Sequence, residues 1–415
     1  MRARIYTLGM TDPTPALFFD DGMGLLAPVR DLRPVFDVRT GALTSRERLC
    51  ASLNLSEAAL FVRPPHAPLL DGAVSVNTLP EDTATDAEGQ VLVINGRCPL
   101  PLDVIAGLRP GQAVTESDSG DLVAARVTPD QTRALLAGTA PDLETVSIDE
   151  RVLISRPWHL RSSRDACLDI DLQLAGRRLP ASPEPAGCCH IGDHPLLISP
   201  DATIFPASVF DTTGGPIAIH AGATVRPAAT IIGPVSIGPG STVLDRALIR
   251  AHTAVGPVCK VAGEIGGTIF QGYANKGHDG YLGDAWVGEW VNLGAGTTNS
   301  NLLNTYGEIT AVAEPGAPRE RTGETFFGCV LGDHTKTAIG TRIMTGSVVN
   351  TGTMWAATAP VTGCVERFSW VTDAGVKRYR ADRFIDVMRT AMGRRKIEPS
   401  EAYEARVQIL ADRDA

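Results

Sequence analysis

The sequence is poor in aromatic residues, which make up 5% of its 415 positions, and it contains no long apolar run. A membrane-spanning helix needs about 18 or more consecutive apolar residues, so none is predicted. The first ten residues, MRARIYTLGM, also lack the apolar core of a secretory signal. We therefore expect a cytoplasmic protein with no membrane partner.

Positive charge is also in short supply, because the formal net charge is -9. This balance argues against nucleic acid or an anionic membrane surface as a partner. The eight cysteines include no CxxC pair, which excludes the usual redox and zinc motifs. Cys188, Cys189 and His190 are residue types that can bind a metal, but they are adjacent and lack the spacing of common metal ligands, so metal binding stays an open alternative.

The second half of the chain contains a six-residue repeat. Eight consecutive positions in this phase carry an aliphatic β-branched residue. Turn residues such as Gly238-Pro239-Gly240 lie between them, and Ile339-Gly340 resembles a further repeat position. The period fits neither an α-helix nor a plain strand, but it is typical of a β-helix. The residues in phase are Ile219, Val225, Ile231, Ile237, Val243, Ile249, Val255 and Val261.

The repeat predicts a left-handed parallel β-helix in a domain of residues 188–365. Its register fails twice, because Val261 and Val287 are 26 residues apart and Leu293 and Ile339 are 46 apart. Neither interval is a multiple of six, so we expect an inserted segment in each. The second interval contains a turn-rich loop at 313–318, which is expected to project from the coil.

The regions on either side of the coil have other patterns. In residues 1–187, apolar runs at 17–19 and 91–94 predict strands, and the sequences from Thr44 and from Pro129 predict helices. Alternating strands and helices predict an α/β domain, which ends in a Pro-rich linker at 181–187. Residues 366–415 are expected to form two helices, at 381–392 and 400–410, that pack over the open end of the coil.

The most polar stretch of the coil carries a specific motif. His278 is followed by Tyr281–Ala285, YLGDA, and then by Val291–Thr297, VNLGAGT. This string resembles the acetyltransferase half of the bifunctional N-acetylglucosamine-1-phosphate uridyltransferase/glucosamine-1-phosphate acetyltransferase, with the same spacing throughout. Nearly the whole chain resembles a bacterial family of sugar nucleotidyltransferase-like proteins related to that enzyme. Further shared motifs are Phe19-Asp20-Asp21, Arg39-Thr40-Gly41, Gly332–Thr337 and Asn350–Thr353.

The resemblance implies roles for particular residues. His278 would be the base that takes a proton from the attacking amine, a task that suits histidine near neutral pH. It could equally be a solvated loop histidine. The resemblance also implies that acetyl-CoA lies between coils of adjacent subunits of a homotrimer. The implied contacts are Tyr281, Asn292 and Asn301 with the sugar phosphate and Ala295 with the acetyl group.

Phosphate binding departs from the family pattern. The family has a basic residue after an Asn-Tyr pair, but residues 301–307 here read NLLNTYG. Lys260 is the candidate replacement that would bind the sugar phosphate. Lys336 is either a ligand of the CoA phosphates or a solvated surface lysine.

The N-terminal domain lacks the glycine-rich loop with which sugar nucleotidyltransferases hold nucleotide phosphates. Gly22 and Gly24 form only a short GxG after the first predicted strand. Four arginines that follow are candidate nucleotide-phosphate ligands, and the alternative is that they pair with Asp31, Asp37 and Glu47. Activity in this domain would require Mg²⁺. The four arginines are Arg30, Arg33, Arg39 and Arg46.

These observations predict a transferase that acetylates an amino-sugar phosphate with acetyl-CoA and carries an attached sugar-1-phosphate nucleotidyltransferase-like domain. One alternative is nucleotidyl transfer alone, with the coil as a trimerisation scaffold. A second alternative is a non-catalytic trimer that binds a sugar nucleotide. A carbonic anhydrase on this coil would need three zinc histidines, and His220 and His252 do not have the required spacing to His278.

Overall fold

The computed structural model describes residues 12–70, 75–139 and 141–413. They form two compact units. The first holds the described residues up to Gly24, together with Arg33–Val38 and Leu43–Ser155, and the second holds Leu25–Leu32, Arg39–Ala42 and the chain from Arg156 onward. The second unit therefore begins earlier along the chain than the linker at 181–187, because helix α4 (His159–Gly176) contacts the coil strands.

The first unit is a seven-stranded sheet with helices, which confirms the predicted α/β domain. The strand order is β3-β2-β1-β4-β6-β5-β7, with β1 parallel to both β2 and β4. Thr44 and Thr128 each form a capping box at the start of a predicted helix. Its elements are β1 (Thr14–Phe19), η1 (Val35–Asp37), α1 (Ser45–Leu53), β2 (Leu55–Phe61), η2 (Ala67–Leu69), β3 (Ser75–Val76), β4 (Val91–Asn95), α2 (Asp103–Ala106), β5 (Gln112–Glu116), β6 (Leu122–Val127), α3 (Pro129–Leu136) and β7 (Glu144–Ile148).

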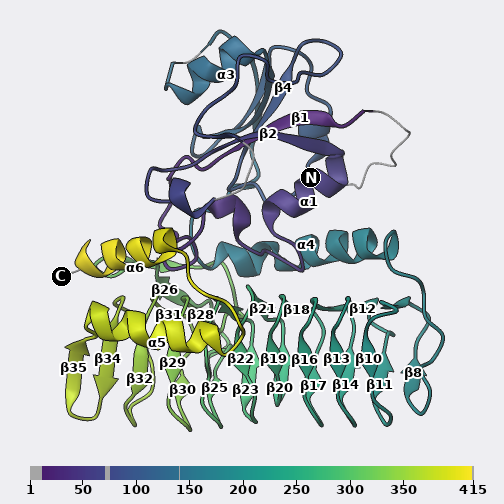
Figure 1. Cartoon of the computed structure of the whole chain (residues 1–415), viewed down its shortest axis with the longest axis vertical. Coiled ribbons are helices and arrows are strands. Elements are labelled where there is room, and N and C mark those ends of the chain that lie inside the picture. The colour runs from purple at the N-terminus through teal and green to yellow at the C-terminus, as the bar shows by residue number, and fades with distance from the viewer. Residues whose placement is uncertain (1–11, 71–74, 140, 414–415) are drawn as a thin grey trace. The chain divides into compact units, whose positions relative to one another are not determined.

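The second unit is a parallel β-helix with three faces, which confirms the predicted coil (Figure 1). The first face contains β8 (Cys189–Ile191), β11 (Val209–Asp211), β14 (Thr230–Ile232), β17 (Leu248–Ile249), β20 (Glu264–Gly266) and β23 (Tyr281–Gly283). The second contains β9 (Leu196–Ile198), β12 (Ile217–Ile219), β15 (Val235–Ile237), β18 (Thr253–Val255), β21 (Ile269–Phe270), β24 (Trp286–Val287), β28 (Cys329–Leu331), β31 (Ser347–Val349) and β33 (Cys364–Val365).

The third face is the one on which the candidate site is built. It starts with β10 (Thr203–Ile204), β13 (Thr224–Val225), β16 (Thr242–Val243), β19 (Lys260–Val261) and β22 (Asn275–Lys276). Single bridges at Asn292 connect it to β29 (Lys336–Thr337). It ends with β32 (Met354–Ala356), β34 (Ser369–Thr372) and the antiparallel β35 (Gly375–Arg378). The remaining coil pair is β25 (Thr298–Asn299) with β30 (Arg342–Ile343).

The hexapeptide residues form the core of the coil because each one points inward at the same place of its face, with three of them on each rung. Ile219 is paired with Ile237 and Ile237 with Val255, so one full coil takes 18 residues in this part. All three side chains are buried. Burial of such a side chain contributes roughly 1.5–3 kcal/mol, so the stacked column stabilises the unit rung by rung.

The first break in the repeat arises from shortened coils, so the expected insertion there is wrong. Paired residues are 18 apart at Val235 and Thr253, but only 15 apart at Lys260 and Asn275. Strands continue on all three faces through this interval. In addition, Ile339 is not a core residue, because 81% of its surface is exposed and Thr337 takes the inward position.

The second break does contain an insertion, as predicted. It forms the antiparallel pair β26 (Thr310–Val312) and β27 (Arg319–Arg321), joined by the expected loop. The hairpin returns to the α4 end of the unit, since the Glu320 carboxylate lies 2.9 Å from Nε of Arg156.

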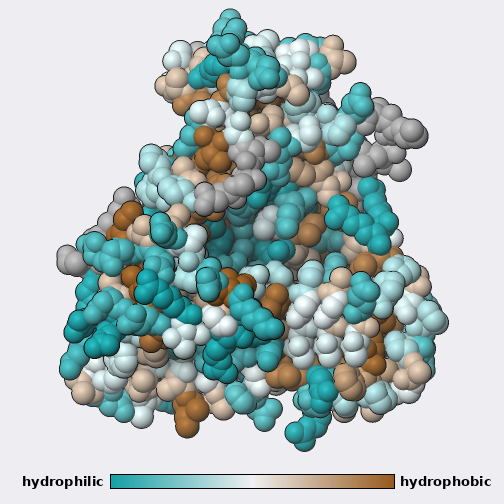
Figure 2. Space-filling model, in the orientation of Figure 1, coloured by the Kyte–Doolittle hydropathy of each residue, from teal (hydrophilic) through white to brown (hydrophobic). Residues whose placement is uncertain are grey.

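The C-terminal helices are α5 (Ala381–Gly393) and α6 (Glu401–Arg413), close to the predicted ranges. They do not cover the end of the coil as expected. Figure 1 shows α5 running beside the strands of the coil, while β34 and β35 form its last rungs. Phe384, Met388 and Met392 pack α5 against an aromatic cluster on the coil. The surface over these helices is mainly hydrophilic (Figure 2). No helix within the described ranges is long and apolar enough to span a bilayer.

A pair of isoleucine variants tests which residues hold the coil. Ile237→Ala leaves a cavity in the buried column and is expected to lower the free energy of unfolding by about 2–5 kcal/mol. Ile339→Ala, at an exposed corner in the same apparent sequence phase, is expected to change it by less than about 0.5 kcal/mol. Denaturant unfolding followed by circular dichroism measures both, and equal losses would contradict the assigned register.

Candidate functional site

A column of polar side chains runs up the third face of the coil. Lys260, Asn275, Asn292 and Lys336 are neighbours on four consecutive rungs. In the regular rungs that precede them, Thr242 takes the same position. The Asn275 Nδ2 group donates a hydrogen bond to Asn292 Oδ1 at 2.7 Å. The shortened coils thus replace a threonine column with two amides flanked by two lysines.

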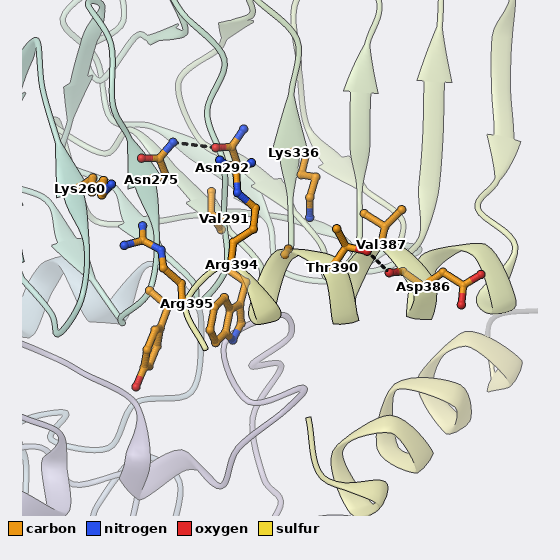
Figure 3. A pocket seen from close by; sticks show the side chains of 13 residues that line it. Lys260, Asn275, Val291, Asn292, Lys336, Asp386, Val387, Thr390, Arg394 and Arg395 are labelled. Atoms are coloured by element: carbon orange, nitrogen blue, oxygen red, sulfur yellow. Dashed lines mark hydrogen bonds between the residues drawn. The ribbon is translucent and has the colours of Figure 1, made fainter. Parts of the chain in front are cut away.

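Helix α5 faces this column across a cavity of about 550 Å³. One side of the helix, at positions 384, 388 and 392, is buried against the coil, while the other side lines the cavity. Figure 3 shows Arg394 and Arg395 extending from the end of α5 toward the two asparagines. The lining residues are Lys260, Tyr273, Asn275, Trp290, Val291, Asn292, Lys336, Asp386, Val387, Thr390, Ala391, Arg394 and Arg395.

Aromatic residues at the corners of the coil hold the helix in place. Tyr273, Trp290, His334 and Phe368 all have positive φ angles of 51–61°, a conformation that usually favours glycine. The Tyr273 and Trp290 rings stack at 4.5 Å, and the His334 and Phe384 rings pack edge to face at 5.6 Å. Their burial offsets the backbone cost of roughly 1–2 kcal/mol per corner. The six-residue pattern contains no signal for this cluster.

A buried lysine fixes the turn that carries His278. Lys276 takes an inward position opposite Val261, and only 1% of its surface is exposed. Its Nζ donates to the carbonyl oxygens of His278, Asp279 at 3.1 Å and Ala262 at 3.4 Å. Burial lowers the pKa of Lys276 to about 8, although Asp279 opposes the shift. Sequence analysis missed this residue, because an aliphatic side chain is expected at that step.

The turn itself exposes the histidine. His278 is solvent-exposed, and its side chain has no hydrogen-bond partner among the described residues. Gly280 closes the turn with a φ of 121°, and a side chain there would collide with the Thr297 carbonyl. The imidazole is therefore accessible, and no carboxylate of the described part of the chain orients it.

Tyr281 and Asn301 form a separate cluster with Asp284. The Asn301 Nδ2 group donates to the Tyr281 hydroxyl at 3.0 Å and to Asp284 Oδ2 at 2.8 Å. Burial raises the pKa of Tyr281, so its hydroxyl stays protonated at neutral pH. This places the two proposed sugar contacts together, on a different face from the cavity that contains Asn292.

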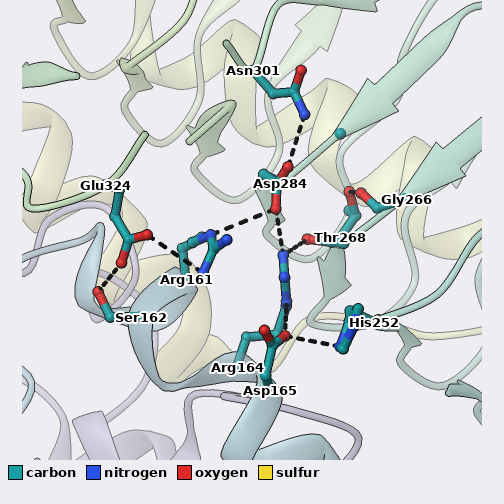
Figure 4. A network of polar contacts seen from close by, with 12 residues as sticks. Arg161, Ser162, Arg164, Asp165, His252, Gly266, Thr268, Asp284, Asn301 and Glu324 are labelled. Carbon is teal, nitrogen blue, oxygen red and sulfur yellow. Dashed lines mark hydrogen bonds and ion pairs between the residues drawn. The ribbon is translucent and has the colours of Figure 1, made fainter. Parts of the chain in front are cut away.

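Helix α4 anchors this cluster from the other side (Figure 4). Arg164 Nη1 donates to Asp284 Oδ1 at 2.7 Å, and its Nε donates to Asp165 at 2.8 Å. Asp165 in turn lies 3.1 Å from Nδ1 of His252. Burial alone would raise the pKa of Asp165, but its bonds to His252 and Arg164 hold it below the usual value. Sequence analysis missed Asp284 and Arg164, whose partners are far apart in the chain.

Ala295 lies at the corner after Asn292. Its carbonyl accepts a hydrogen bond from the Gly340 N–H at 2.7 Å. The Ala295 N–H has no such partner within the described ranges. A free backbone donor at this point is the kind of group that stabilises an oxyanion.

Two of the four N-terminal arginines, Arg39 and Arg46, form hydrogen bonds or ion pairs within the protein. Arg46 pairs with Asp37 at 2.8 Å and with Glu57 at 2.9 Å. Arg39 Nε donates to the Gln271 carbonyl at 3.0 Å. Arg33 is buried and Arg30 half-buried. A phosphate ligand at Arg39 or Arg46 would have to displace these bonds.

Asp31 contacts two residues of the coil. Its carboxylate binds Arg367 Nε at 2.7 Å and the Thr351 hydroxyl at 2.8 Å. It therefore ties the segment Leu25–Leu32 to the last rungs of the coil.

The first unit has a cavity of its own, of about 350 Å³, at the carboxyl ends of β1, β2 and β4. Ligands of open α/β sheets commonly bind at such an edge. Asp20 Oδ1 accepts from the Gly22 N–H at 2.9 Å, and Asp21 pairs with Arg97 at 2.6 Å. Within the described ranges, no three acidic, histidine or cysteine side chains gather as a ready-made metal site.

Comparison with known proteins supports one part of the predicted relationship directly. Residues 16–178 match the sugar nucleotidyl transferase family. The prediction of a sugar nucleotidyltransferase-like segment is thereby confirmed over that range, and the match supports a transferase. No curated protein sequence matches the chain.

Solved structures similar to the chain include acyltransferases. The acetyltransferase domain of PglB from Neisseria gonorrhoeae is 12% identical, with a TM-score of 0.20, over 88% of this chain and 98% of that one. AntD, an N-acyltransferase from Bacillus cereus solved with dTDP and 3-hydroxybutyryl-CoA, is 12% identical with a TM-score of 0.18, over 51% of this chain and 93% of that one. Values this low do not transfer a function.

The Lys276 ammonium gives a testable pH dependence. Its pKa is lower in the folded state, so the unfolded state binds more protons between about pH 8 and the ordinary lysine value of 10.5. Stability is therefore expected to rise with pH in this window, by on the order of 2 kcal/mol from this group.

Lys276→Met provides the comparison, because it removes the titrating group and keeps most of the volume. Unfolding free energies at pH 7 and pH 10 should give a smaller rise for the variant than for the wild type. An equal rise in both proteins would show that Lys276 is not the buried cation.

Proposed function

We propose that the coil catalyses acetyl-CoA-dependent N-acetylation of an amino-sugar phosphate and that residues 1–187 form an attached nucleotidyltransferase-like domain. The observation that carries this proposal is the corner of the coil at which Asn301 joins Tyr281 and Asp284, beside the turn of His278. This corner offers polar groups for sugar hydroxyls and an accessible base. We further propose that the protein is cytoplasmic.

The proposed chemistry uses five residues of the coil. The sugar amine attacks the thioester carbonyl while His278 removes the amine proton. The carbonyl oxygen becomes an oxyanion, for which the Ala295 N–H is a donor. The carbon–sulfur bond then breaks, CoA leaves as a thiolate, and the proton from His278 neutralises it. Lys260 and Asn292 would hold the sugar phosphate, and Lys336 the CoA phosphates.

A homotrimer forms part of the proposal, because His278 has no orienting partner among the described residues of its own chain. A neighbouring coil would supply one and would enclose the exposed turn. Sedimentation equilibrium should give three times the chain mass of 43.9 kDa.

His278→Ala tests the base directly. Thiol release from acetyl-CoA with glucosamine 1-phosphate should fall by a factor of roughly 10²–10⁴, mainly in kcat, because a general base contributes about this much. His194→Ala, which removes another exposed histidine of the second unit, should keep wild-type activity. Equal rates in wild type and His278→Ala would rule out His278 as the base.

Nucleotidyl transfer is the second candidate function, and the family match over 16–178 favours it. The cavity of the first unit would then bind the nucleotide with Mg²⁺. Pyrophosphate release from UTP and a sugar 1-phosphate should occur only when Mg²⁺ is added. Activity in this assay without thiol release in the other would select nucleotidyl transfer with the coil as a scaffold.

A further inference from the structure

The cavity between the third face and α5 has an unusual charge balance for a chain with a net charge of -9. Four of its lining residues are basic and one, Asp386, is acidic. Asp386 lies 3.8 Å from Arg389, which is outside the cavity. Within the described ranges, no carboxylate forms an ion pair with the four cavity cations, Lys260, Lys336, Arg394 and Arg395.

Such a concentration of like charge is unfavourable unless an anion binds there. Lys336 is partly buried beside these cations. Burial lowers its pKa to about 8, and its Nζ donates to the His334 carbonyl at 3.3 Å. The cavity therefore has the electrostatics of an anion site before any ligand enters.

The spacing of the column indicates the shape of the anion. Successive rungs lie about 4.8 Å apart, so the backbones of Lys260 and Lys336 are roughly 14 Å apart across three rungs. The two asparagines lie between them. Asn292 Oδ1 already accepts a bond from Asn275, which leaves the Asn292 amide nitrogen as a donor.

Arg394 and Arg395 reach this middle section from the opposite wall (Figure 3). Two guanidinium groups can each bind one phosphoryl group in a planar, two-pronged arrangement. A volume of about 550 Å³ is also in the range of sites for ligands much larger than a simple phosphate.

We infer that this cavity binds a pyrophosphate diester, with Arg394 and Arg395 on its two phosphoryl groups, and with Asn292 and the two lysines facing the polar groups on either side of them. Both CoA and a nucleoside diphosphate sugar contain this unit. This site goes beyond the proposed acyl transfer. It assigns a pyrophosphate ligand to Arg394 and Arg395, which follow α5, whether that pyrophosphate belongs to CoA or to a nucleotide sugar.

Calorimetric titration of the full-length protein tests the site. The probes are coenzyme A, UDP-glucose and, as a monophosphate control, glucose 1-phosphate. At least one diphosphate ligand should bind, more tightly than glucose 1-phosphate and with an affinity that falls as salt is raised. Binding of coenzyme A identifies the thioester co-substrate as the source, and binding of UDP-glucose alone identifies a nucleotide sugar.

The double variant Arg394→Gln/Arg395→Gln should weaken binding by roughly tenfold or more, the usual loss for charge-assisted hydrogen bonds. Arg394→Lys/Arg395→Lys keeps the charge and should recover part of it. The matched control is Arg380→Gln/Arg383→Gln. It removes two positive charges at the N-terminal end of α5, and neither residue lines the cavity. Melting curves verify that each variant is folded.

The inference is overturned if neither diphosphate binds below about 1 mM, if glucose 1-phosphate binds as tightly as both, or if the control pair causes the same loss. These results are separable from the catalytic proposal. Binding of UDP-glucose alone would uphold the cavity and contradict a CoA site, whereas loss of thiol release in His278→Ala with unchanged CoA binding would support both.

Discussion

Parallel stacking of one rung on the next is the constraint on which the second unit depends. Each inward position repeats on the next rung, so a column of Val and Ile side chains forms a continuous core. The same stacking acts on outward positions, where a residue type repeated along a column becomes a surface of one character. The Lys-Asn-Asn-Lys column is such a surface. It begins where the spacing of paired residues falls from 18, between Thr242 and Lys260, to 15, between Lys260 and Asn275.

In the irregular coils, polar side chains form hydrogen bonds to backbone groups inside the coil. Lys276 enters the core and binds the carbonyls of the next turn, and Asn299 bonds both the N–H and the carbonyl of Gly283, at 2.7 and 2.8 Å, where a strand ladder is interrupted. Buried polar groups of this kind are costly unless they are hydrogen-bonded. Here these bonds fix the corners around His278 and Asn301.

The regular features could be predicted from the sequence, because periodicity reports which side chains are buried. The coil, the capped helices at Thr44 and Thr128, and the two C-terminal helices follow from local patterns of this kind. The direction of α5 along the coil could not be predicted, since it depends on an aromatic cluster assembled from four distant corners. The link from Arg164 to Asp284 crosses 120 residues of sequence and likewise leaves no local signal.

The candidate site shows the same division. Sequence analysis selected Asn292 by motif resemblance and Lys260 and Lys336 as candidate phosphate ligands, and the structure shows that the three belong to one column facing one cavity. It did not select Arg394 or Arg395, because their role depends on how α5 packs. His278, Tyr281 and Asn301 lie around the next corner of the same rungs, so an extended ligand would have to follow the coil surface from the cavity to the histidine turn.

A crystal structure of the protein grown with coenzyme A is the most direct test of this account. The account predicts electron density for the pyrophosphate between the asparagine pair and α5, with the thiol arm leading toward Ala295 and His278. Density for coenzyme A at another surface, with the cavity free of it at saturating concentration, would contradict the assignment of the coil as a CoA-dependent acyltransferase site.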